Sequence, residues 1–156
     1  MPDTVQSLAD RLRDDGGRVM EFFSNLTPQQ WEIPVYEQNG SWTFHHLLAH
    51  FVSAEIGRKE LIINVAAGGE GAPVGFIIDD FNKQDVDRLS TESNPHLMEL
   101  FFMERSSLAR FVSSLDVKKL ELIGNDPFLG AVPLLEMIKL TYLHLQIHLR
   151  DARRCL

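Results

Sequence analysis

Residues 41–67 read SWTFHHLLAHFVSAEIGRKELIINVAA, and this stretch decides the fold. Its apolar residues recur at intervals of three and four positions, which places them on one broad face of a helix. Ser41 or Thr43 can cap the start of this helix, and the glycine-rich segment 68–71 ends it. The pattern therefore predicts a helix over Thr43–Ala66. The apolar positions are Leu47, Leu48, Phe51, Val52, Ile56, Leu61, Ile62 and Val65.

Three further segments carry the same helical periodicity, whereas no segment shows convincing strand alternation. They predict helices over Thr4–Leu26, Pro95–Leu115 and Pro133–Arg153, with prolines at the starts of the last two. A short helix is expected around Asp80–Leu89, and the connectors 27–40 and 67–94 have room for such elements. The predicted fold class is all-α, an antiparallel four-helix bundle with short extra helices in the connectors, as a single domain over residues 1–156.

Composition and charge argue against several classes of partner. The chain has 15 Lys and Arg against 22 Asp and Glu, a net charge of -7, so it lacks a general attraction for phosphate backbones. We therefore expect no nucleic-acid partner and no membrane partner. The N-terminal segment lacks the pattern of a secretory signal, and the single cysteine, Cys155, favours a reducing compartment. A cytoplasmic location is expected.

The histidines carry the candidate chemistry. The spacing His-x-x-x-His, which can bind a metal ion, occurs twice among the six histidines, at His46/His50 and at His144/His148. Residues four apart lie on one helix face, so either pair can hold one ion, although such pairs are also found as ordinary helix-surface residues. His50, His144 and His148 stand among apolar residues, and buried imidazole rings need partners. Ligands from two helices can converge in a bundle, and three of them leave coordination positions open.

Three segments together indicate a family. Residues 40–50 read GSWTFHHLLAH, residues 142–148 read YLHLQIH, and residues 78–82 read IDDFN. In their order and spacing they resemble the DinB/YfiT-like metalloenzymes, four-helix-bundle proteins in which a histidine of the second helix and a histidine pair of the last helix bind a divalent ion. The resemblance implies that His50, His144 and His148 are the metal ligands.

The resemblance also implies a function. We expect a metal-dependent enzyme that acts on a small molecule. It is either an S-transferase or isomerase that uses a low-molecular-weight thiol, or a hydrolase. Zn or Ni is the favoured ion, with Fe, Mn and Cu as alternatives, and affinity should fall below pH about 6.5, where free histidine is protonated. A homodimer is expected. The alternatives are a non-catalytic metal- or ligand-binding stress-response protein and, if the histidines point apart, an interaction module without metal.

Several other residues have two interpretations each. His46 is either a further ligand or partner of a ligand, or a solvated ring, and Glu55 and Glu60 are either a base or solvated carboxylates. His96 stands at a helix start and is expected to have no role. Three residues of the third segment either reach the metal or cap a short helix: Asp79, Asp80 and Asn82.

Overall fold

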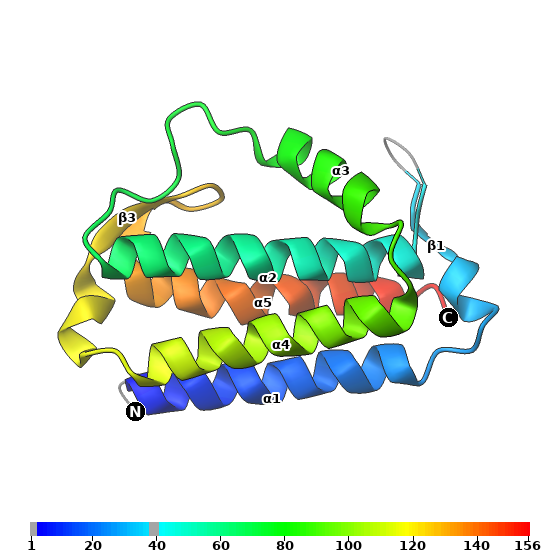
Figure 1. The fold of residues 1–156 in the computed structure, drawn as a ribbon, viewed down its shortest axis with the longest axis horizontal. Helices are drawn as coiled ribbons and strands as arrows, with labels where there is room; N and C mark the ends of the chain where they lie inside the picture. The colour runs from blue at the N-terminus through cyan, green and yellow to red at the C-terminus, as the bar shows by residue number, and fades with distance from the viewer. Residues whose placement is uncertain (1–2, 38–40) are drawn as a thin grey trace.

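The structure is a computed structural model that describes residues 3–37 and 41–156, and its fold is shown in Figure 1. The four longest helices lie side by side, and α1 and α2 each contact both α4 and α5. Gly40, the first residue of one of the quoted segments, lies outside the described residues. Within those residues, no helix combines the length and apolar character needed to cross a membrane. The five α-helices found there are α1 (Val5–Ser24), α2 (Phe44–Ala66), α3 (Ile78–Leu89), α4 (Asn94–Ser113) and α5 (Leu134–Arg153).

Local sequence explains where these helices begin. Thr43 caps α2, with its hydroxyl accepting from the backbone of His46 while the His46 ring bonds back to Thr43. The cap of α4 is Ser93, one residue before the predicted position, so that Pro95 falls in the first turn. Each of the four predicted long helices is therefore confirmed to within a few residues at both ends.

The expectation of an all-α fold is confirmed only in part: the described residues are mostly helical, but they also form two small antiparallel sheets. The first pairs β1 (Pro34–Tyr36) with β2 (Trp42–Thr43), and the second pairs β3 (Ile123–Asp126) with β4 (Gly130–Pro133). Strands of two to four residues are too short to show alternation. The β3–β4 turn is held by Asp126, whose carboxylate accepts hydrogen bonds from two backbone amides of the turn.

The interior consists of two apolar clusters with a polar layer between them. One cluster contains Phe23, Phe44, Phe51 and Phe101, and the other is built around leucines and isoleucines such as Leu12 and Ile138. The residues that separate the clusters along the four long helices are buried and charged or polar. They are Asp15 on α1, Glu55 and Arg58 on α2, Arg105 on α4 and Thr141 on α5.

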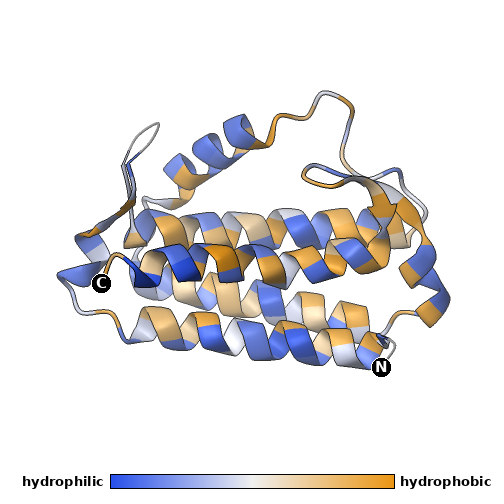
Figure 2. Cartoon of the chain, turned by 180° about the vertical axis from the view of Figure 1, so that it is seen from behind, coloured by the Kyte–Doolittle hydropathy of each residue, from blue (hydrophilic) through white to orange (hydrophobic). Residues whose placement is uncertain are grey.

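Helix α3 covers one side of α2 and differs from the four long helices. Figure 2 shows that α3 is mainly hydrophilic, and within it only Val86 and Leu89 are buried. The segment 67–77 leads from the end of α2 to α3 and passes close to the β3–β4 hairpin, where the backbone of Ala72 bonds to Asn125. This segment, α3 and the hairpin together form the surroundings of the candidate site.

Candidate metal centre

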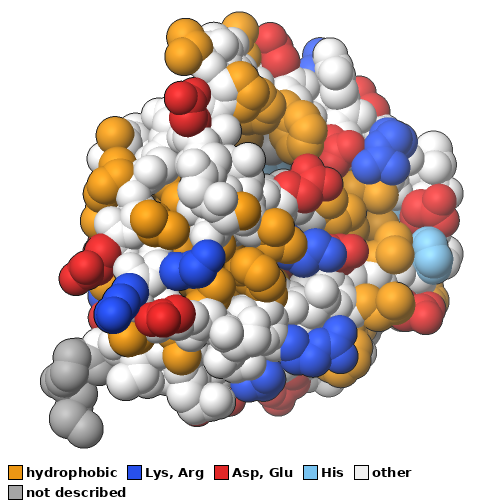
Figure 3. Space-filling view, turned by 60° about the vertical axis from the view of Figure 1, so that its left-hand side comes forward, with side chains coloured by type: hydrophobic (Ala, Val, Ile, Leu, Met, Phe, Trp, Pro, Cys, Tyr) orange, Lys and Arg blue, Asp and Glu red, His pale blue; other side chains and the backbone are white. Residues whose placement is uncertain are grey.

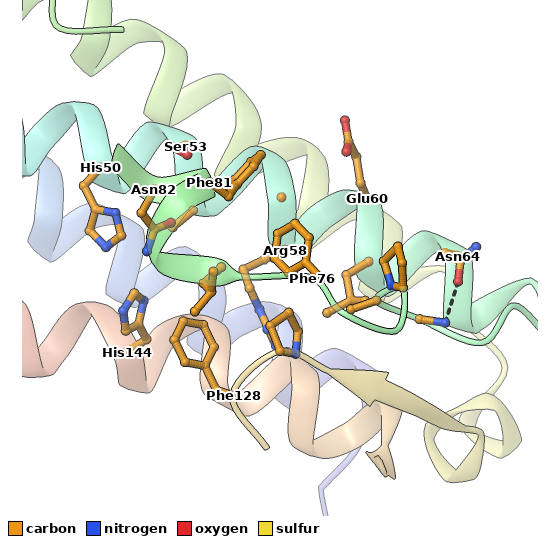
Figure 4. A pocket seen from close by; sticks show the side chains of 18 residues that line it. His50, Ser53, Arg58, Glu60, Asn64, Phe76, Phe81, Asn82, Phe128 and His144 are labelled. Carbon is orange, nitrogen blue, oxygen red and sulfur yellow. Dashed lines mark hydrogen bonds between the residues drawn. The ribbon is translucent and has the colours of Figure 1, made fainter. Parts of the chain in front are cut away.

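Three histidines from two neighbouring helices meet at one point. His50 lies on α2, and His144 and His148 lie one turn apart on α5, which contacts α2. One ring nitrogen from each lies within 4.8 Å of the others, and the His144 and His148 Nε2 atoms are 3.0 Å apart. Figure 4 shows the rings of His50 and His144 turned toward one another. The structure thus brings together the three residues named from the sequence.

His148 is oriented by two residues that lie outside the histidine group. The phenol of Tyr36 donates a hydrogen bond to the Asp151 carboxylate at 2.7 Å, and its oxygen lies 2.8 Å from His148 Nδ1. A hydroxyl has one hydrogen, so when Tyr36 donates to Asp151 it must accept from His148. His148 therefore carries its proton on Nδ1, and the lone pair of Nε2 faces His144. Partners of this kind fix the ring and tautomer of metal-binding histidines.

His50 is held by packing. The ring is 3% exposed and lies against Trp42, with 5.2 Å between the ring centroids. Its Nδ1 is buried and has no hydrogen-bond partner among the described residues. Leaving a buried polar atom unpaired costs about 1–3 kcal/mol, which is the kind of deficit that a ligand offsets.

The electrostatics of the group keep the rings uncharged. Burial lowers the pKa of His144 to about 4, assisted by His148 and by the positive charge of Arg58. Burial also lowers the pKa of His148, and it lowers that of His50 well below its usual value, with the two other histidines adding to the effect. The rings therefore stay neutral at pH values lower than the 6.5 expected from the sequence.

The three residues fit a divalent cation of the first transition series. Neutral imidazole is the form that binds such ions, and the pair one turn apart on α5 supplies two donors from one helix. The lone pair of His148 Nε2 and the orphaned polar atom of His50 agree with an ion between the rings. Hard cations such as Mg²⁺ and Ca²⁺ prefer oxygen donors. The group found among the described residues contains three histidines and no oxygen donor.

The remaining histidines lie elsewhere. His46 is part of the cap of α2, with Nδ1 at 3.0 Å from the Thr43 hydroxyl, and it does not belong to the candidate metal-binding group of the described residues. His45 joins the start of α2 to α4, with its ring nitrogens close to Ser90 and Asn94 oxygens. His96 is exposed and lies 3.7 Å from Glu92.

The carboxylates considered from the sequence divide into three groups. Glu60 is exposed, as one interpretation expected. Glu55 is neither solvated nor a base beside the metal, because it is 1% exposed and binds the Arg105 guanidinium through both oxygens. Asp79 and Asp80 lie in the first turn of α3, where negative charge is favourable, and they border a large cavity of about 1320 Å³ that also reaches His148.

Sequence reasoning missed the buried Arg105 group. Its guanidinium binds Glu55, Asp15 and the carbonyl of Leu12, and Gln146 donates to Asp15. These groups come from all four long helices and lie up to 131 positions apart. The close approach of Arg105 explains why position 16 is a glycine, because a Cβ there would lie 2.8 Å from the arginine side chain. No local spacing in the sequence signals this network.

A second cavity of about 390 Å³ opens directly beside His50 and His144. Its sides are formed by α2, by the segment 71–78, by the start of α3 and by the tip of the β3–β4 hairpin. Asn82 lines both cavities, so it stands between them. Volumes of this size are typical of small-molecule sites. The histidine group is therefore accessible from two sides.

Two solved structures have similar folds. The mycothiol-dependent maleylpyruvate isomerase superposes with a TM-score of 0.78 over 96% of this chain and 61% of its own, at 16% identity. The chain thus spans 61% of that protein's length. The colibactin self-resistance protein ClbS, solved in complex with a dsDNA, superposes with a TM-score of 0.69 over 100% and 99% of the two chains, at 17% identity. Among curated proteins, no sequence matches significantly.

The ClbS structure corrects one expectation. We expected from the net charge of -7 that nucleic acid is excluded as a partner, and this exclusion is wrong, because a protein of similar fold over its whole length was solved with dsDNA. Net charge is a sum over the chain and does not describe the field at one face. A model of the DinB superfamily matches residues 11–152, which confirms the resemblance seen in the sequence, and the chain belongs to the DinB superfamily.

Proposed function

We propose that the chain is a metal-dependent enzyme that transfers a low-molecular-weight thiol to a small molecule or uses it in an isomerisation. In this proposal, residues 1–156 form one domain, the long helices act as a four-helix bundle, and His50, His144 and His148 hold one divalent cation. The observation that carries the proposal is the convergence of these three imidazoles beside a cavity of about 390 Å³. The thiol dependence named for the isomerase of similar fold supports the choice of co-substrate.

A divalent cation at this position lowers the pKa of a thiol or water that it binds, which is the chemistry needed for thiol transfer or hydrolysis. The chain's own residues supply the rest. The neutral rings present lone pairs, while Tyr36 and Asp151 keep the His148 proton on Nδ1. The apolar walls of the cavity limit the water that can compete with a thiol.

A non-catalytic role for the metal is the main alternative. A structural zinc site has four protein ligands, whereas a catalytic one keeps an open position. His46 was the candidate for a fourth ligand, but its ring serves the cap of α2. Three ligands with two adjacent cavities support an open site. Zn or Ni suits the three nitrogen donors, and hydrolysis remains the second candidate reaction because it needs the same open position.

The test starts with protein purified without a polyhistidine tag and without added metal. Element analysis should find one divalent ion per chain, lost with a chelator and restored by Zn²⁺ or Ni²⁺. The loaded protein should then consume electrophiles only when a low-molecular-weight thiol is present. Consumption without thiol would favour the hydrolase. A full complement of metal with no turnover of any thiol and electrophile pair would favour the non-catalytic protein.

A further inference from the structure

The smaller cavity has one wall of small residues and one of aromatic residues. Ser53, Ala54 and Gly57 lie along α2, and three phenylalanines stand around them (Figure 4). Figure 3 shows hydrophobic side chains grouped on the face where the β3–β4 hairpin comes forward. The phenylalanines are Phe76 in the segment before α3, Phe81 on α3 and Phe128 in the hairpin, and each is between 37% and 47% exposed. Exposed aromatic rings around a hollow are typical of a binding site.

Gly57 leaves room in the wall of the cavity. A glycine inside a helix destabilises it by about 1 kcal/mol relative to alanine. At Gly16 and Gly124 close neighbours explain the absence of a side chain, but a Cβ at Gly57 would meet no heavy atom within 4 Å. Packing within the described residues therefore does not require glycine at position 57. A larger side chain would instead extend into the cavity that Gly57 lines.

The charges of the cavity do not suit an anion. Arg58 is the one cation among the residues that line it, and its guanidinium is already used: it binds Asp126 and the Met137 carbonyl, both at 2.7 Å. Glu60 adds a negative charge. In the metal-free protein, an anionic group placed here would lose its hydration without gaining a free cation, which is unfavourable.

Ser53 is a buried polar residue in the wall of the cavity. Its side chain is fully buried, and Oγ has no hydrogen-bond partner among the described residues. Ser53 lies one turn after His50 on the same face of α2. A ligand with one uncharged hydrogen-bonding group would satisfy this hydroxyl close to the histidines.

We infer that this cavity binds an uncharged small molecule with an apolar, aromatic-sized body and one hydrogen-bonding group. The inference rests on the proposed function in one respect, since it makes this molecule the electrophile that reacts at the histidines. Specificity then differs from that of an enzyme for organic acids, because the body of the ligand lies between the phenylalanines and Gly57, where no free cation is present among the lining residues.

Two fluorescent probes that differ by one charged group test the inference. N-phenyl-1-naphthylamine is uncharged and has an N–H group, and 1-anilinonaphthalene-8-sulfonate is the same molecule with a sulfonate. In titrations of metal-free protein, the uncharged probe should bind one site per chain, at least about tenfold more tightly than the sulfonate. Equal or tighter binding of the sulfonate would overturn the inference.

Substitutions at glycine locate the binding site. Gly57→Leu should weaken the uncharged probe at least about tenfold, because the side chain occupies the cavity, and Gly57→Ala should act more weakly in the same direction. Gly17→Leu is the matched control, since Gly17 is an exposed helical glycine on α1 with no heavy atom near its added Cβ. The inference is wrong if the two Gly57 variants bind the probe as the parent does while circular dichroism shows them folded.

Metal content, measured on the same proteins before the metal is removed, separates this inference from the proposed function. Gly57→Leu should retain the metal of the parent, because the side chain at position 57 is directed into the cavity. If the parent holds metal but binds no uncharged probe, the inference fails and the proposed function stands. If the parent holds no metal but binds the uncharged probe, and Gly57→Leu abolishes that binding, the proposed function fails and the cavity assignment stands.

Discussion

The phenol oxygen of Tyr36 lies 2.8 Å from Nδ1 of His148, a residue 112 positions away in the chain. The contact exists because the short sheet of β1 and β2 places Tyr36 beside the last turns of α5. Burial and the hydrogen bond to Asp151 raise the pKa of Tyr36, so it stays a phenol and keeps its proton for the carboxylate. The same hydrogen bond lowers the pKa of Asp151.

Tyr36→Phe should weaken metal binding without unfolding the protein. The substitution keeps the ring but removes the oxygen that holds the Nδ1 proton of His148. Loss of such a partner lowers metal affinity by about 10–100-fold. A competition titration with a chelator measures the change. Tyr142→Phe is the control, because Tyr142 packs in the other apolar cluster. If the two variants bind metal with equal affinity, Tyr36 does not support the metal site.

His50→Ala should have a larger effect, because it removes the link from α2 to the pair on α5. We expect metal affinity to fall by more than the roughly 10–100-fold assigned to an outer partner, with most helical content retained in circular dichroism. His96→Ala, at an exposed position, should match the parent. If His50→Ala holds metal as tightly as the parent in the chelator titration, the proposed ligand set is wrong.

The parts of the fold that follow from neighbouring residues could be predicted. The long helices carry their own periodicity, α1, α2 and α4 also carry their own caps, and the pair His144 and His148 is visible as a spacing of four. The hairpin of β3 and β4 could not be predicted in this way. The strand Ile123–Asp126 reads IGND, and its pairing depends on contact with a segment that is itself only four residues long.

The polar parts of the interior depend on long-range contacts. Glu55 reads as one of many helix carboxylates until α4 brings Arg105 against it, 50 positions later. The same holds for Tyr36, which lies in a connector, and for Arg58, whose partner Asp126 is in the hairpin. Helical periodicity indicates which face is buried, but it cannot show which distant charge lies opposite a polar residue on that face.

Arg105→Met should strongly destabilise the fold without removing the metal site. Methionine fits the space but leaves the carboxylates of Asp15 and Glu55 buried without their cation. Breaking a buried pair from one side costs about 3–5 kcal/mol. Urea unfolding should report a loss of this size. In the control Arg13→Met, the side chains of the pair with Asp10 are 45% and 59% exposed, and the loss should stay under about 1 kcal/mol. Similar losses in both variants would contradict the role of the network.

The metal-free protein should lose stability as pH falls below about 6.5. Burial lowers the pKa of His144 to about 4, so between these values the unfolded chain binds more protons than the folded one. The stability that neutral His144 contributes is fully present above pH 6.5 and is lost as the pH falls toward 4. By pH 4.5 this one residue accounts for roughly 2–3 kcal/mol. Urea unfolding of the parent and of His144→Gln at pH 7 and pH 4.5 measures the contribution of His144 together with its coupling to the other two histidines, because the remaining titrating groups are common to both. His96→Gln should keep the full pH dependence, since His96 is exposed. If the parent and His144→Gln lose the same stability between the two pH values, His144 is not buried in its neutral form.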